Sequence, residues 1–89
     1  MIQAHIYYIG TVQGVGFRYT AQRYAEIYKL TGWVKNLSDG RVEMTVCGLK
    51  ASIEEFCSKL DAHFDGFISN RTVEYSENNP SFEKFQIIG

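Results

Sequence analysis

The fold of this chain depends on one stretch of nine residues, Gly10-Thr11-Val12-Gln13-Gly14-Val15-Gly16-Phe17-Arg18. Before it, residues 2–10 include an apolar run of β-branched and aromatic residues, which is typical of a strand. After it, apolar residues recur at helical spacing and predict an amphipathic helix over residues 17–29. The stretch is therefore predicted to be a turn that joins a strand to a helix.

The glycines of this turn predict an anion-binding site. Glycine has no Cβ and reaches positive φ at little cost, so the backbone can approach a ligand closely. The free N–H groups of the loop and of the first helical turn, together with the helix dipole, attract negative charge. Arg18 adds a planar fork of donors suited to phosphate. The spacing alone leaves a second interpretation open, in which the glycines only permit close packing of a strand against a helix.

Two other glycine-rich motifs do not match this stretch. A P-loop requires Lys followed by Ser or Thr after its last glycine, where this chain has Phe17-Arg18. A dinucleotide-binding fingerprint requires a further glycine three residues after Gly16, and that position is Tyr19.

The stretch resembles the signature of the acylphosphatases, small enzymes that cleave the carboxyl–phosphate bond of acyl phosphates. Their second signature is similar to Gly32-Trp33-Val34-Lys35-Asn36-Leu37-Ser38-Asp39-Gly40-Arg41-Val42-Glu43, and the ending Phe82-x-x-Phe85-x-Ile87 resembles their last strand. The resemblance runs nearly from end to end of the chain. It implies a metal-free and cofactor-free hydrolase whose products are a carboxylate and inorganic phosphate, acting on carboxyl phosphates such as acetyl, carbamoyl or glycerate phosphates.

The resemblance also implies roles for particular residues. Asn36 would orient the attacking water through its side-chain amide, although its local position at a turn equally suits support of the backbone. An amide does not accept a proton at neutral pH, so the destination of the water proton stays open. Animal members commonly carry Thr after this Asn, and the chain has Leu37 there, which leaves the rate open. The phosphoryl oxygens would be held by the Arg18 guanidinium and by the N–H groups of Gln13, Gly14, Val15, Gly16, Phe17 and Arg18.

The remaining patterns predict an α+β fold. The order strand, helix, strand, strand, helix, strand matches a ferredoxin-like split βαβ sandwich, with a short final strand added and both helices on one face of a mostly antiparallel sheet. Gly32 is expected at the turn after the first helix, and Ser52-Ile53-Glu54-Glu55 has the form of a capping box for the second. The expected elements are strands at 33–37 and 42–48 joined by Ser38-Asp39-Gly40-Arg41, a helix from Ser52 or up to three residues earlier to Phe64, a strand at 68–75, a polar loop at 76–80 and a strand at 82–88.

Size and composition limit what this chain can be. Its 89 residues predict one domain, 1–89, and it is expected to be a monomer. The formal net charge of −1 gives no general attraction to nucleic acid or to a membrane surface. With no leader and no apolar run of about 18 residues, we expect a cytoplasmic protein. Cys47 and Cys57 lack CxxC spacing and are expected to be reduced thiols, and His5 and His63 have no partner at metal-ligand spacing.

Three other functions are considered from the sequence. The strongest is a non-enzymatic regulatory module that binds an anionic metabolite without turning it over. Nucleic-acid binding on the sheet is disfavoured because the basic and aromatic signature of RNA-recognition domains is absent. A role like that of acylphosphatase-like domains in larger carbamoyl-handling maturation enzymes is the third, and a chain of this length that begins at Met1 favours a free-standing enzyme instead.

Overall fold

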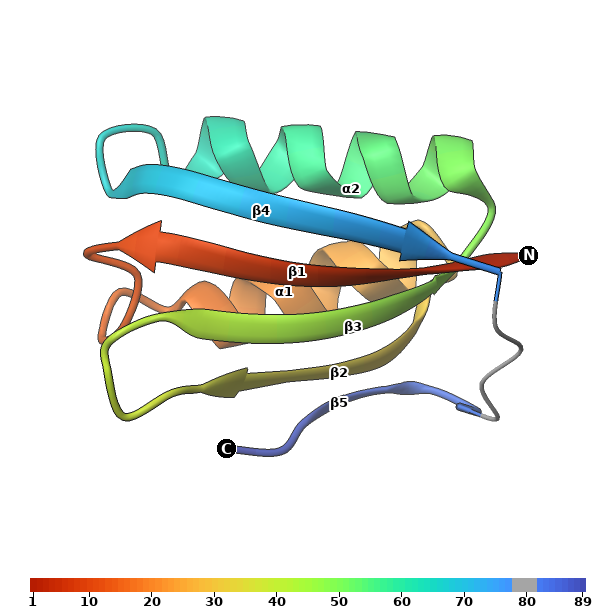
Figure 1. Ribbon diagram of the computed structural model, residues 1–89, viewed down its shortest axis with the longest axis horizontal. Coiled ribbons are helices and arrows are strands. Elements are labelled where there is room, and N and C mark those ends of the chain that lie inside the picture. Colours follow the sequence, from red (N-terminus) through yellow and green to blue (C-terminus); the bar gives the residue numbers. More distant parts are fainter. Residues whose placement is uncertain (78–81) are drawn as a thin grey trace.

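The computed structural model, which describes residues 1–77 and 82–89, confirms the predicted α+β architecture (Figure 1). In these residues, one sheet has the strand order β4-β1-β3-β2-β5, in which only the pair of β2 and β5 is parallel. Both helices lie on the same face of the sheet, behind the strands in Figure 1. The elements are β1 (Ile2–Gly10), α1 (Phe17–Ile27), β2 (Thr31–Asn36), β3 (Val42–Gly48), α2 (Lys50–His63), β4 (Ile68–Ser76) and β5 (Phe85–Ile87).

The core lies between the sheet and the two helices. On β1, the residues that face the helices are fully buried, whereas their neighbours His5 and Tyr7 lie on the opposite, open face. The inward residues of β3 stand opposite those of β1, and both central strands therefore bury a continuous apolar surface. The helices complete this core with apolar residues at helical spacing. The largest contributions come from Ile6 and Tyr8 of β1, Val42, Met44 and Val46 of β3, Phe17 of α1, and Ile53, Phe56 and Leu60 of α2.

The first helix is shorter than predicted. It ends at Ile27 instead of Lys29, because Lys29 adopts a left-handed conformation with φ of 58°. The N–H of Leu30 then donates to the Ala25 carbonyl at 2.8 Å and closes the helix end. Gly32 is consequently not the turn residue that we expected, and it lies within β2, opposite Val46 of β3.

The second helix begins at Lys50, within the range predicted for its start, whereas the last strand begins at Phe85, later than predicted. The capping box is wrong, because the N-cap of α2 is Leu49, no side chain of the described residues caps the helix, and Ser52 lies inside it. The chain enters this helix directly after β3, which ends at Gly48. The last strand is limited to Phe85–Ile87 because it pairs with only three residues of β2. The predicted loop at 76–80 falls partly outside the described residues, and Ser76 belongs to β4.

Candidate functional site

The strand-to-helix turn forms an open loop at the start of α1. Gly16 is the N-cap of this helix and has φ of 82°, which an L side chain rarely adopts. The first main-chain bond of the helix runs from the Thr20 N–H to the Gly16 carbonyl at 3.0 Å. Within the described residues no side chain caps the helix, and its first turn contains no acidic residue. Its first N–H groups therefore have no intrahelical acceptor and are available to an anion.

The core holds this loop at both ends. Val12 and Phe17 are buried to within 2% of full coverage. The Phe17 ring lies 4.8 Å from the Tyr8 ring and 4.7 Å from the Phe64 ring, measured between centroids. Both ends of the loop are therefore anchored in the core, whereas Gly16 between them is exposed.

A cavity of about 200 Å³ lies against the loop and receives residues from three elements. It brings together five of the seven residues predicted for the site, namely Gly14, Gly16, Phe17, Arg18 and Asn36. The other two predicted residues do not line it: Val15 packs against the core, and the Gln13 side chain points toward the β2–β3 hairpin. The remaining wall is made by Val12, Tyr19 and Ile87, which the sequence did not single out.

Arg18 lies in the first turn of α1 and is half-buried. One guanidinium nitrogen, Nη1, donates to the main-chain oxygen of Gly89, beyond the end of β5. A guanidinium has five N–H donors, so this contact orients the group and leaves donors for a bound anion. The contact joins residues 71 positions apart in the chain, which no local sequence pattern could predict.

Asn36 is the last residue of β2, and it lines the cavity opposite the loop. Its Oδ1 is buried and has no hydrogen-bond partner among the described residues. The hairpin beside it is held by other groups: the Leu37 N–H donates to the Arg41 carbonyl at 2.8 Å, and Asp39 accepts from the N–H and Nε of Arg41 at 3.1 and 2.8 Å. In the described structure, no side-chain hydrogen bond of Asn36 supports its alternative role in holding the turn.

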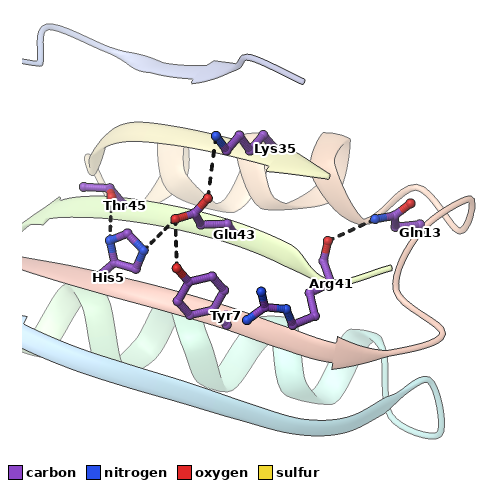
Figure 2. A network of polar contacts seen from close by, with 7 residues as sticks. All are labelled: His5, Tyr7, Gln13, Lys35, Arg41, Glu43 and Thr45. Carbon is purple, nitrogen blue, oxygen red and sulfur yellow. Dashed lines mark hydrogen bonds and ion pairs between the residues drawn. The ribbon is translucent and has the colours of Figure 1, made fainter. Parts of the chain in front are cut away.

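Gln13 connects the loop to this hairpin. Its Nε2 donates to the carbonyl of Leu37 at 2.7 Å and to the carbonyl of Arg41 at 3.0 Å, and Figure 2 shows the contact to Arg41. The sequence predicted only a main-chain contribution from Gln13. Its carbonyl partners lie 24 and 28 residues away, so the role of the side chain had no local signal.

A second polar network lies on the open face of the sheet, with Glu43 at its centre (Figure 2). Glu43 Oε2 accepts from Tyr7 at 3.1 Å and contacts His5 Nε2 at 2.8 Å, and its Oε1 lies 3.7 Å from Lys35 Nζ. The hydrogen bond to Glu43 raises the pKa of the Tyr7 phenol. None of these residues lines the cavity, so His5 has a partner in the sheet and no place in the site.

The described residues offer little for other chemistry. They contain no group of three His, Cys, Asp or Glu side chains placed to hold a metal ion. Neither of the helices in this part of the chain is long and apolar enough to cross a bilayer. Cys47 and Cys57 are unbridged and buried, and burial raises the pKa of both thiols.

Comparison with known proteins identifies relatives of the whole chain. The sequence model of the acylphosphatases matches residues 4–87. An acylphosphatase of Bacillus licheniformis is 40% identical over 88 residues, which are 98% of this chain and 98% of that protein.

Solved structures agree with the sequence comparison. The crystal structure of the Bacillus subtilis acylphosphatase covers the whole of both chains with a TM-score of 0.94 at 36% identity. The structure of HypF from T. kodakarensis matches all of this chain but only 12% of its own, with a TM-score of 0.84 at 31% identity. The same fold is therefore found both in a chain of this size and within a much longer one.

Proposed function

Because the chain belongs to the acylphosphatase family, as its two motifs predicted, and is thus an enzyme that hydrolyses acyl phosphates, we propose how its cavity performs this reaction. The loop from Gln13 to Arg18 and the Arg18 guanidinium bind the phosphoryl group, and Asn36 positions the attacking water. The water oxygen bonds to phosphorus, the bond from phosphorus to the acyl oxygen breaks, and the carboxylate leaves with the bonding electron pair. The products are a carboxylate and inorganic phosphate.

An acyl phosphate requires little acid or nucleophilic catalysis because its leaving group is already a stable carboxylate. Positioning and electrostatic stabilisation therefore supply most of the acceleration, as in other phosphoryl transfers. The open N–H groups at the start of α1 and the guanidinium beside them provide fixed positive charge for the equatorial phosphoryl oxygens. This arrangement suits a group on which negative charge is spread during transfer.

The observation that carries the proposal is the buried, unpaired Oδ1 of Asn36 on the cavity wall, as judged within the described residues. A buried acceptor without a partner is costly, and a catalytic role or a bound water is among the reasons why a native protein keeps one. A water molecule that donates one hydrogen to Oδ1 would have a lone pair free to attack phosphorus. The amide directs this water without accepting its proton, which passes to a phosphoryl oxygen or to solvent.

Three broader features belong to the same proposal. The chain acts as a single domain, 1–89, and as a monomer on small-molecule carboxyl phosphates. It binds no nucleic acid, since its net charge is −1 and its anion site is local. It acts in the cytoplasm, where two buried thiols stay reduced.

The test is the hydrolysis of a model acyl phosphate by the parent protein and by Arg18→Ala. The variant loses charge and donors from the phosphoryl site, so kcat/KM is expected to fall by about 10²–10³. Inhibition by inorganic phosphate should weaken in parallel. Arg23→Ala is the matched control, because Arg23 lies exposed on the same helix and does not line this cavity.

The two readouts also separate the competing interpretations. Unchanged phosphate inhibition in Arg18→Ala would move the anion site elsewhere. Phosphate binding without any turnover by the parent protein would favour the non-enzymatic regulatory module.

A further inference from the structure

We propose that Gln13 is a positioning residue that holds the phosphate loop in register with Asn36, an inference that rests on the proposed function. The carbonyls that accept from its amide belong to Leu37 and Arg41, on either side of the hairpin turn. Leu37 directly follows Asn36 in the chain. A single side chain thus connects the backbone that binds phosphate to the backbone that presents the water-positioning amide.

The two parts that Gln13 connects are each rigid. The loop is fixed by its buried anchors Val12 and Phe17, and Gln13 directly follows the first of these. The hairpin is fixed by the contacts of Arg41 with Asp39, and the Arg41 guanidinium lies 4.6 Å over the Tyr7 ring. Figure 2 shows the Arg41 side chain beside Tyr7 while its carbonyl faces Gln13. The loop and the hairpin can then move mainly relative to each other, and the two hydrogen bonds of Gln13 restrain that movement.

The chemistry of the amide suits this role. The two N–H donors of one NH₂ group can each serve one carbonyl. Both carbonyls already accept a bond within the turn, from the Gly40 N–H at 3.2 Å and from the Leu37 N–H at 2.8 Å. Losing the Gln13 amide would therefore leave no carbonyl without a partner, and the hairpin would keep its own bonds. The expected consequence is a change in the distance between loop and Asn36, and a misplacement of about 1 Å can cost up to about 10² in rate.

The experiment compares Gln13→Met with Gln22→Met in kcat, in phosphate inhibition and in the denaturant midpoint. Methionine has nearly the length of glutamine but no donors. Gln22 is the matched control, because its Nε2 also donates to a main-chain carbonyl, that of Phe85 at 3.3 Å, and it does not line the cavity. For Gln13→Met, kcat should fall by about 10-fold while the inhibition constant of phosphate changes by less than about twofold. Gln22→Met should keep the kcat of the parent.

A double-mutant cycle with Asn36→Ala identifies the route of the effect. If Gln13 acts through Asn36, then Gln13→Met should lower kcat by less than about twofold once Asn36 is already alanine. A purely structural role would give the same loss in both backgrounds. Gln13→Asn keeps the amide but is one methylene too short to reach both carbonyls, so it should also lower kcat. This variant replaces Gln13→Met in the experiment if Gln13→Met does not fold.

Three results would overturn the inference. Full kcat in a folded Gln13→Met or Gln13→Asn protein would do so while leaving the proposed function intact. Additive losses in the cycle would reduce Gln13 to a structural residue. An inactive parent protein would overturn the proposed function itself, and this inference with it.

Discussion

Replacing Asn36 with alanine should separate activity from stability in this protein. The side chain lines the cavity, its Oδ1 is buried, and within the described residues this atom has no hydrogen-bond partner. If the amide positions water, its removal should lower kcat by about 10²–10³, which corresponds to about 3–4 kcal/mol of barrier. The affinity for inorganic phosphate should change little, because the proposed mechanism assigns phosphoryl binding to the loop and Arg18.

The effect on stability follows from the hydrogen bonds of the same side chain. In the proposed role Oδ1 accepts from a water molecule, so Asn36→Ala leaves no protein group without a partner. The substitution breaks no side-chain hydrogen bond of Asn36 that is present in the described structure. Differences in strand preference among all residues span only about 1 kcal/mol. The free energy of unfolding should therefore change by less than about 1 kcal/mol.

The assay combines initial rates on a model acyl phosphate, phosphate inhibition and urea denaturation. Asn70→Ala is the matched control, because Asn70 also lies in a strand but uses its Oδ1 to accept from the Arg71 N–H at 2.8 Å. This control should lose some stability and keep its turnover. A folded Asn36→Ala protein with full kcat would refute the catalytic role, and a large loss of stability with normal kcat would restore the turn-supporting role.

Three further outcomes are expected. Gly16→Ala and Gly66→Ala should each cost about 1–2 kcal/mol of stability, because both glycines have φ near 80–90° and no described atom lies within 4 Å of the added Cβ. Only Gly16→Ala should also lower kcat/KM, and equal activities of the two variants would contradict the role of the loop in the site. Above about pH 9 the free energy of unfolding should fall, because burial raises the pKa of Cys57 above 9.0 and that of Tyr8 above 10.0. Both side chains then ionise at lower pH in the unfolded chain than in the folded one. Their contribution to the free energy of unfolding is therefore complete below the unfolded pKa and is lost as the pH rises through the folded pKa. In urea titrations at increasing pH, Tyr8→Phe should show a shallower decline than the parent protein. Hydrolysis should continue in excess EDTA, since the described residues hold no group of three potential metal ligands, and abolition by EDTA with recovery on adding a divalent metal would contradict this.

The sequence by itself determined the fold class and the family. Strand and helix periodicity are properties of neighbouring residues, and they predicted the order of the elements. The loop from Gln13 to Arg18 was likewise readable, because its glycines and the arginine that follows lie within one turn of backbone. The ends of the elements were less predictable. For example, α1 ends early because Lys29 adopts a left-handed conformation, which a lysine at that position does not predict.

Only the tertiary structure decided how the site is assembled. The sheet order brings the end of β2 near the loop, so that Asn36 and Arg18 line the same cavity. It also supplies partners that lie far along the chain, such as the Leu37 carbonyl for Gln13 and the Gly89 oxygen for Arg18. These contacts depend on which strands pair and in which register. Hydrogen bonding is satisfied in three dimensions, and local sequence patterns carry no record of a partner 24 or 71 residues away.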